Sequence, residues 1–298
     1  MLSRVRRRGL FMSDRTYCVD GELVPASSAT VSVTDRGFKY GDAAFETLRA
    51  YGGEPFAWDE HLDRLSHTCQ LLGFEPGYDR SELLTLTNRT LAANDLTEAY
   101  IRLSISRGSH GGKLDPPDDP EPMLVIIVSE LPRGGTDGTD VWTSPATAAI
   151  VETRRVSNDA LPSDAKTHNY LNGILARSDS TADETIMLDA DGHLTEGATS
   201  NLFFCTDETL RTPSLSGSVL PGITRELVID LARDCGFDVE TGSYTPAALY
   251  ESDGAFFTNT TWEVRPIERV GDRTYGDCSI IDRLRTAFDE YVEAEHYP

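Results

Sequence analysis

The chain has 298 residues, of which 49 are acidic and 27 are basic, so its formal net charge is −22. This excess of negative charge argues against nonspecific binding to nucleic acid or to an anionic membrane surface. No apolar run approaches the roughly 18 residues of a membrane span, whereas the hydrophobic content of 39% is enough for one large or two ordinary domains.

The first eleven residues depart from the acidic composition, because they hold four arginines and no acidic side chain. A secretory signal peptide would continue into an apolar stretch of about 7–15 residues, and only Gly9-Leu10-Phe11 follows the arginines. We therefore predict a disordered extension over residues 1–13, with Met12 as an alternative start.

A small α+β domain is predicted over residues 14–130. Asp20-Gly21 is typical of a two-residue hairpin turn. Apolar residues at helical spacing indicate a helix between a capping Asp59 and Gly73. Residues 108–122 are rich in glycine, proline and aspartate, which predicts a long loop that is functional or mobile. In chain order the predicted elements are a hairpin at Tyr17–Val24, a strand at Thr30–Val33, helices at Asp59–Gly73 and Ser81–Asn94, and strands at Ala99–Ser106 and Met123–Glu130.

A linker is predicted at residues 131–140, because glycine recurs there with proline, threonine and aspartate. Residues 141–298 then form a larger domain in which strands and helices mix. Its predicted strands are Val141–Val151, Glu184–Leu188, Asn201–Cys205, Ala255–Asn259 and Trp262–Ile267, and its predicted helices are Tyr170–Thr181, Thr224–Gly236 and Ile280–Glu295.

Cysteine, histidine and lysine usage bounds the chemistry further. Five scattered cysteines form no Cys-x-x-Cys pair, which predicts reduced thiols and a cytoplasmic location. Six histidines form no His-x-x-His or His-x-x-x-His pair, so no metal site is predicted. Many carboxylates with only three lysines predict a surface adapted to high salt, with a merely acidic soluble protein as the alternative.

Lys166 is the most informative lysine. It is one of three, against 24 arginines, and amine chemistry is a function that arginine cannot perform. Thirty residues later Glu196 precedes a turn of small residues. The pair predicts a pyridoxal 5'-phosphate enzyme, with Lys166 as the Schiff-base lysine and Glu196 as the partner of the pyridine nitrogen. Taken singly, a surface lysine at a helix start and an exposed turn glutamate are the alternatives.

A phosphate of such a cofactor needs a cup of donors. Pro221-Gly222-Ile223-Thr224-Arg225 opens a predicted helix, whose free N–H groups and positive end suit a phosphate. Arg64 is a second candidate, although Glu60 makes a surface ion pair the alternative. Hydroxyls of Thr258–Thr261 at the end of an apolar strand are a third. An ordinary helix start and a strand edge remain the alternatives for the first and third.

In this order, six markers resemble the class IV aminotransferase family. Its members are fold type IV pyridoxal-phosphate enzymes with a D-amino-acid aminotransferase-like, two-domain fold of α+β and α/β character. The resemblance covers roughly residues 16–297. The markers are Asp35-Arg36-Gly37-Phe38-Lys39-Tyr40-Gly41-Asp42 with Phe45-Glu46-Thr47, His61-x-x-Arg64-Leu65, Lys166-x-x-Asn169-Tyr170, Glu196-Gly197-x-x-x-Asn201-Leu202-Phe203, Gly222-Ile223-Thr224-Arg225, and Thr258-Asn259-Thr260 with Glu263.

The resemblance implies a role for each candidate residue. Lys166 holds the cofactor and moves the Cα proton, Glu196 pairs with the ring nitrogen, and Tyr170 lies near the tyrosine that contacts the phenolic oxygen. The gap from Lys166 to Tyr170 is one residue shorter than in branched-chain enzymes. The implied phosphate ligands are Arg64, Ile223, Thr224 and Thr260, and the substrate-pocket candidates are Tyr40, Phe45, Arg102, Arg107 and Lys113. The family also implies a homodimer, with residues 141–298 as the cofactor-binding domain.

Local sequence patterns help to choose between the reactions that members of this family catalyse. Residues 108–114 lack the Arg-x-His carboxylate trap of D-amino-acid transaminases, whereas Tyr100-Ile101-Arg102 resembles branched-chain enzymes. Ile105-Ser106-Arg107-Gly108-Ser109 and the short gap from Lys166 to Asn169 resemble 4-amino-4-deoxychorismate lyases of folate biosynthesis. We therefore expect such a lyase, which releases pyruvate and 4-aminobenzoate. A transaminase for branched-chain or other L-amino acids with 2-oxoglutarate is the main alternative. A non-catalytic binding protein is disfavoured, because both Lys166 and Glu196 are retained.

Overall fold

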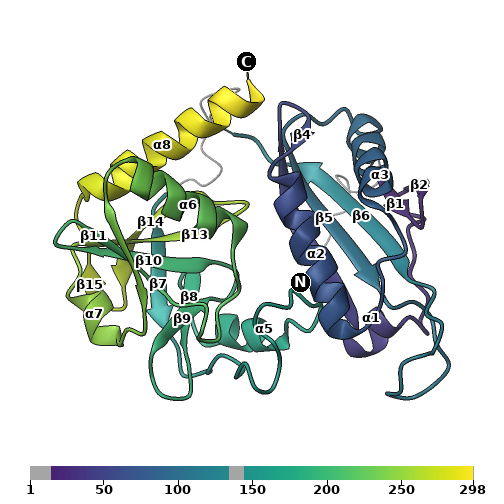
Figure 1. Cartoon of the computed structure of the whole chain (residues 1–298), viewed down its shortest axis with the longest axis horizontal. Coiled ribbons are helices and arrows are strands. Elements are labelled where there is room, and N and C mark those ends of the chain that lie inside the picture. Colours follow the sequence, from purple (N-terminus) through teal and green to yellow (C-terminus); the bar gives the residue numbers. More distant parts are fainter. Residues whose placement is uncertain (1–14, 134–143, 298) are drawn as a thin grey trace, which may run out of the picture. The chain divides into compact units, whose positions relative to one another are not determined.

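The computed structural model describes residues 15–133 and 144–297. The predictions for residues 1–13 and for 134–143 lie outside these residues. The chain forms two compact units (Figure 1), with the main boundary between Leu131 and Pro132. Thr167–Asn169 belong to the first unit, although Lys166 and Tyr170 on either side belong to the second.

The first unit is a six-stranded sheet with two long helices packed on it (Figure 1). Its hydrophobic core joins leucines of both helices, such as Leu65 and Leu83, to the central strands. The strand order is β2-β1-β6-β5-β3-β4, with every pair antiparallel. The elements are β1 (Thr16–Val19), β2 (Glu22–Pro25), α1 (Arg36–Tyr40), β3 (Ala43–Tyr51), β4 (Glu54–Pro55), α2 (Trp58–Leu72), α3 (Arg80–Ala92), β5 (Ala99–Ser106) and β6 (Met123–Glu130).

Most of the predicted elements of this unit are confirmed, and β5 and β6 agree residue for residue. The predicted strand at Thr30–Val33 is wrong, because these residues form an exposed loop in which the Ser32 hydroxyl accepts from the Thr34 backbone N–H. The predicted cap at Asp59 is also wrong. α2 begins one residue earlier after Ala57, and Asp59 lies in the first turn, where a negative charge favours the helix dipole.

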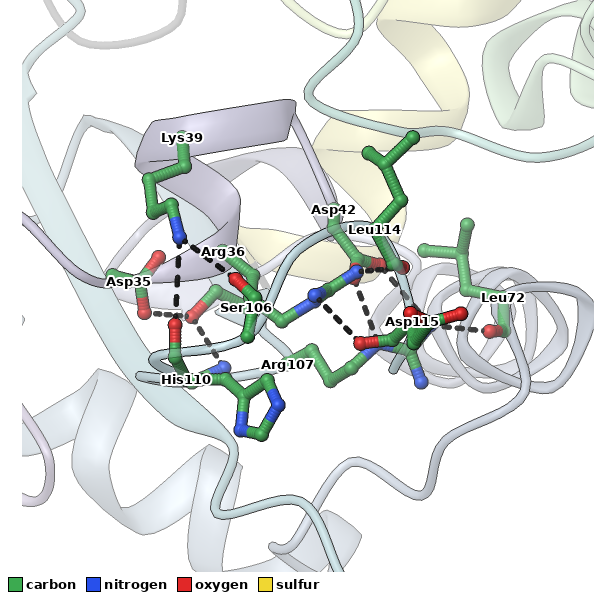
Figure 2. A network of polar contacts seen from close by, with 12 residues as sticks. Asp35, Arg36, Lys39, Asp42, Leu72, Ser106, Arg107, His110, Leu114 and Asp115 are labelled. Carbon is green, nitrogen blue, oxygen red and sulfur yellow. Dashed lines mark hydrogen bonds and ion pairs between the residues drawn. The ribbon is translucent and has the colours of Figure 1, made fainter. Parts of the chain in front are cut away.

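The predicted loop over residues 108–122 is held by the cations of α1 (Figure 2). The Arg36 guanidinium donates to the backbone carbonyls of Lys113, Leu114 and Asp115, at 3.0, 3.0 and 3.2 Å. Lys39 Nζ donates to the carbonyl of Gly112 at 3.3 Å. Gly108 starts the loop with φ +89°, and a Cβ there would lie 1.8 Å from the Glu121 carbonyl oxygen. Only glycine fits at this position.

Asp42 is the shared anion of this network. Its carboxylate accepts from Arg36 Nε at 2.7 Å and from Arg107 Nε at 2.8 Å. Burial opposes ionisation of Asp42, but hydrogen bonds from Arg107 and Arg36 outweigh it and lower its pKa. The carboxylate therefore stays charged and compensates two guanidinium groups that are themselves 4% and 6% exposed.

An Asp42→Asn substitution should destabilise the protein by about 3 kcal/mol, because it leaves two buried cations without their anion. Asparagine keeps one acceptor oxygen, which places the loss near the low end for breaking a buried ion pair. Urea denaturation of the purified variant measures the change. Asp63→Asn is the control, because Asp63 is 71% exposed in its pair with Arg80 and should change stability by less than about 1 kcal/mol. Equal stabilities of the two variants would contradict this role of Asp42.

The second unit is built on a nine-stranded sheet of order β12-β11-β10-β13-β14-β7-β8-β9, with β15 on β14. β9 also contacts β10, so the sheet curls on itself. Helices α6 and α8 lie side by side over it (Figure 1). The elements are β7 (Ala146–Ile150), α5 (Leu171–Ser178), β8 (Glu184–Leu188), β9 (Leu194–Gly197), β10 (Asn201–Thr206), β11 (Thr209–Pro213), α6 (Ile223–Asp234), β12 (Asp238–Gly242), α7 (Pro246–Tyr250), β13 (Gly254–Asn259), β14 (Glu263–Val270), β15 (Arg273–Thr274) and α8 (Ser279–His296).

The predicted strands and helices of this unit are confirmed within their described residues, with shifts of a few residues at their ends. Strands β9, β11, β12 and β15 and helix α7 were not predicted. Among residues 15–133 and 144–297, none of the helices has both the length and the hydropathy needed to cross a bilayer.

Candidate active site

A buried carboxylate is the centre of the site in the second unit. Glu196 lies on β9 and is 7% exposed. Its Oε1 accepts from Arg155 Nε at 2.8 Å, and its Oε2 accepts from the Leu220 backbone N–H at 2.9 Å and from Asn201 Nδ2 at 3.4 Å. The carboxylate is therefore oriented from three directions, and the alternative of an exposed turn glutamate is wrong.

The electrostatic environment of Glu196 suits a hydrogen bond from a protonated ring nitrogen. Burial raises its pKa, opposed in part by the charge of Arg155, the N–H of Leu220 and the charge of Lys166. The last contribution places Lys166 within electrostatic reach of Glu196. A carboxylate whose proton affinity is raised is a strong acceptor for the N–H of a protonated heterocycle.

Arg155 is a site residue that the sequence analysis missed. Its Nε–Glu196 contact joins residues 41 positions apart, and its NH1 group lies 3.5 Å from Asn172 Oδ1. Nothing in the local pattern distinguishes it from the other arginines of the chain.

Lys166 ends a loop that precedes α5. Its Nζ lies 5.7 Å from the centre of the Tyr170 ring, so the two predicted residues are neighbours despite their short spacing. Lys166 and Tyr170 are both partly exposed.

The N-terminus of α6 was predicted as part of the phosphate cup. Gly222 is its N-cap and provides no side-chain cap, so the first backbone N–H groups at Ile223 and Thr224 have no side-chain acceptor there. A Cβ on Gly222 would lie 1.9 Å from Asn201 Oδ1, and Asn201 Nδ2 donates to the Leu220 carbonyl at 3.0 Å. Asn201 thus links this turn to Glu196. Thr224 is buried at 5% exposure.

The turn after β13 holds the remaining predicted phosphate ligand in this unit. Asn259 Oδ1 accepts from the backbone N–H groups of Thr261 and Trp262 at 2.9 and 2.7 Å, and Thr260 lies within this turn. Two buried polar atoms, Thr258 Oγ1 and Arg225 Nε, have no hydrogen-bond partner among the described residues. This donor-rich set, together with the α6 terminus, Glu196 and Lys166, fits a phosphorylated heterocyclic aldehyde such as pyridoxal 5'-phosphate.

Arg64 lies in the first unit, on α2, where it forms a fork with Glu46. Its Nε and NH2 groups donate to the two carboxylate oxygens at 2.8 and 2.7 Å, and His61 Nδ1 lies 2.8 Å from the same carboxylate. Burial opposes ionisation of Glu46, but Arg64 and His61 outweigh it and lower its pKa to about 2. The Arg64 side chain is 9% exposed, so the alternative of a surface ion pair with Glu60 is wrong.

The predicted substrate-pocket residues divide into two groups in this unit. Arg102 lies over the Phe45 ring, with its guanidinium carbon 3.8 Å from the ring centre, and Tyr40 is 40% exposed at the end of α1. Arg107 instead donates to Asp42 and to the carbonyls of Leu72 and Gly73. These contacts give Arg107 a structural role. Lys113 is exposed on the loop that Arg36 holds.

Comparisons with known proteins agree with this chemistry. The family model "Amino-transferase class IV" matches residues 43–270. A putative branched-chain-amino-acid aminotransferase of Methanocaldococcus jannaschii is 36% identical over 266 residues, which are 88% of this chain and 90% of that protein. An aminodeoxychorismate lyase of Bacillus subtilis is 31% identical over 266 residues, 88% of each chain.

Solved structures extend the similarity to the fold. A branched-chain aminotransferase of Thermoproteus uzoniensis, crystallised with norvaline, superposes with a TM-score of 0.86 at 30% identity and covers 94% of this chain and 95% of its own. The branched-chain amino acid aminotransferase of Escherichia coli has a TM-score of 0.85 at 29% identity, covering 93% of this chain and 94% of its own. A further branched-chain enzyme, solved with pyridoxamine 5'-phosphate, has a TM-score of 0.87 at 27% identity. The two-domain fold is therefore that of fold type IV enzymes.

Proposed function

Because the chain belongs to the class IV aminotransferase family, which uses pyridoxal 5'-phosphate, we propose that it is a transaminase for branched-chain and similar L-amino acids. One observation supports this choice most: similar proteins that align over most of their length, in sequence and in structure, are named branched-chain aminotransferases. The cognate partner in this proposal is a 2-oxo acid such as 2-oxoglutarate.

The residues of the chain divide the work. When bound, the cofactor supplies an aldehyde that holds the substrate amine and a ring that withdraws electrons from its Cα. In the proposal, the Nζ of Lys166 removes and returns the Cα proton. Glu196, oriented by Arg155 and Asn201, keeps the ring nitrogen protonated. The phosphate would be held by the N-terminus of α6 with Thr224 and by Thr260, whereas Arg64 is bound by Glu46 in the first unit.

An aminodeoxychorismate lyase is the second candidate, favoured by the Bacillus subtilis relative and by the Ser106-Arg107-Gly108 pattern. The structure accounts for that pattern by packing. Ser106 Oγ donates to Asp35 at 2.6 Å, Arg107 is bound by Asp42, and Gly108 is required by its close contact with Glu121. Since the pattern serves the loop, it does not discriminate between the two reactions, and the preference for a lyase is replaced by the transaminase proposal.

A substrate panel tests the choice. The pyridoxal-phosphate-loaded enzyme is offered L-leucine, L-norvaline, D-alanine or aminodeoxychorismate, each with and without 2-oxoglutarate, in low and in molar KCl because of the acidic surface. The proposal expects oxo-acid and glutamate formation from the L-amino acids in equal amounts, and only with the acceptor present. Pyruvate and 4-aminobenzoate formed from aminodeoxychorismate without any acceptor, combined with inert L-amino acids, would refute it in favour of the lyase.

A homodimer and a cytoplasmic location remain part of the proposal. The homodimer is supported by the segment around α1, which exposes large apolar side chains. Val33 is 76% exposed and Phe38 is 72% exposed, and Tyr40 lies in the same segment. Exposed apolar groups gathered in one segment are typical of protein interfaces. Light scattering of the purified enzyme would give the mass of one chain if this expectation is wrong.

A further inference from the structure

Glu184 is a buried carboxylate to which the proposed mechanism gives no role. It lies on β8, next to the strand that carries Glu196, and its side chain is 1% exposed. Arg177 NH1 lies 3.8 Å from its Oε1, a long ion pair in which the arginine side chain is 37% exposed. A buried charge needs compensation, so the hydrogen-bond partners of Glu184 indicate what it does.

Most of the hydrogen bonds to Glu184 come from one turn. Its Oε2 accepts from the Thr199 backbone N–H at 3.1 Å, from the Thr199 hydroxyl at 2.7 Å and from the Ser200 hydroxyl at 3.1 Å. Its Oε1 accepts from the Thr185 backbone N–H at 2.8 Å. An ionised carboxylate only accepts hydrogen bonds, and these donors match its lone-pair positions. The turn is therefore tied to β8 through the Glu184 side chain.

This turn connects Glu196 on β9 to Asn201 on β10. The Gly197 backbone N–H donates to the Ser200 carbonyl at 2.7 Å, which closes a tight turn. Glu196 and Asn201 are the next residues on either side, and Asn201 Nδ2 donates to Glu196 Oε2 at 3.4 Å. Because side chains alternate between the two faces of a strand, a slip of one residue here would move Glu196 to the other face.

Glutamine at position 184 would not satisfy the same donors. It would replace one accepting oxygen of Glu184 by an amide N–H2 group. The hydroxyls of Thr199 and Ser200 can rotate to accept from this group, but the backbone N–H groups of Thr185 and Thr199 cannot. One of these N–H groups would face a donor, which is costly inside a protein. The turn would move to relieve this contact, and the Glu196 carboxylate would move with it.

We propose that Glu184 is a positioning residue, which holds the turn between β9 and β10 and thereby orients the Glu196 carboxylate toward the ring nitrogen of the cofactor. The inference rests on the proposed role of Glu196. Arg155 and Asn201 contact Glu196 directly, whereas Glu184 acts through the turn. The proposal also gives a function to the two hydroxyls that follow Glu196 in the motif, since both donate to Glu184.

Competition between pyridoxal 5'-phosphate and its 1-deaza analogue tests the proposal without turnover. The analogue has carbon in place of the ring nitrogen but keeps the aldehyde and the phosphate, so contacts common to both cleanly cancel. The holoenzyme is brought to equilibrium with the analogue, and both bound compounds are quantified by chromatography after denaturation. The preference of wild type for pyridoxal 5'-phosphate should fall roughly tenfold in Glu184→Gln, as for the loss of one charge-assisted hydrogen bond.

A double-mutant cycle shows whether Glu184 acts through Glu196. Glu196→Gln should lower the preference at least as much as Glu184→Gln, and the double variant should lower it no further, because both changes affect one contact. An unchanged preference in Glu184→Gln, or effects of the two variants that add in full, would overturn the proposal. If Glu196→Gln keeps the wild-type preference, the role of Glu196 at the ring nitrogen fails, and this inference fails with it.

Two further variants complete the test. Asp183→Asn is the matched control, because this neighbouring carboxylate is 44% exposed and accepts from Thr147 instead of the turn, so the preference should stay at the wild-type value. Thr199→Val removes a single hydroxyl at an exposed position and should lower the preference about threefold. It carries the test if Glu184→Gln does not fold, and an unchanged preference in this variant would then refute the proposal.

Discussion

The Lys166→Ala enzyme is expected to lose about 10⁴-fold or more of its transaminase rate, because no other side chain of the described site offers an amine to move the Cα proton. Lys166 lies beside Tyr170 and within electrostatic reach of Glu196. In the proposal, the Cα proton of the substrate is moved at this place. Steady-state rates with L-leucine and 2-oxoglutarate measure the loss.

Lys166→Arg separates the charge of the side chain from its amine. Arginine keeps the positive charge near Glu196 but remains protonated at every usable pH, so it cannot act as a base or a nucleophile. It should be as inactive as the alanine variant, and both should unfold at wild-type denaturant concentrations. Substantial turnover by Lys166→Arg would show that the site needs only a cation there.

The Glu196→Gln enzyme is expected to lose on the order of 10³-fold in rate, or about 4 kcal/mol of barrier. Glutamine retains the size of the side chain and one acceptor oxygen. It cannot carry the negative charge that keeps a ring nitrogen protonated, so electron withdrawal from the substrate weakens. Glu240→Gln is the control, because Glu240 is 58% exposed in a surface pair with Arg211 and should leave the rate unchanged.

The pH dependence of stability gives Glu196 a second readout in the apoenzyme. Because the folded-state pKa of Glu196 is raised, the folded protein favours the protonated carboxyl. The stabilising contribution of this group is fully present below its unfolded-state pKa and is lost as the pH rises through the raised folded-state pKa. The free energy of unfolding of wild type should therefore fall over that interval, and Glu196→Gln should reduce the slope. In the activity assay, an unchanged transaminase rate of Glu196→Gln would contradict the proposed role of Glu196 at the ring nitrogen.

Helices and strands with a clear local pattern were predictable from the sequence. Strands buried on both faces and contacts between distant residues were not. β5 and β6 follow from apolar alternation between turn signals. β3 was missed because eight of its nine residues are buried, among them Glu46 and Arg49, so no alternation reveals it. The extended look of Thr30–Val33 failed because hydroxyl groups there bond to the local backbone instead of a neighbouring strand.

The same distinction applies to the site. Lys166, Glu196 and the α6 terminus carry short motifs, and the structure places Glu196 beside Asn201 and Leu220 as a site requires. Arg155 has no motif, since its partner Glu196 lies 41 residues away on another strand. Arg107 shows the converse, because a motif residue that suggested substrate binding is bound by Asp42, 65 residues away.

Reduction of the pyridoxal-phosphate-loaded enzyme with borohydride, followed by peptide mass mapping, tests the central claim most directly. The chain has only three lysines, so Lys39 and Lys113 are internal controls in the same digest. We predict one phosphopyridoxyl group per chain, located on Lys166. A label on Lys39 or Lys113 instead, or no label on any lysine, would contradict the proposed mechanism.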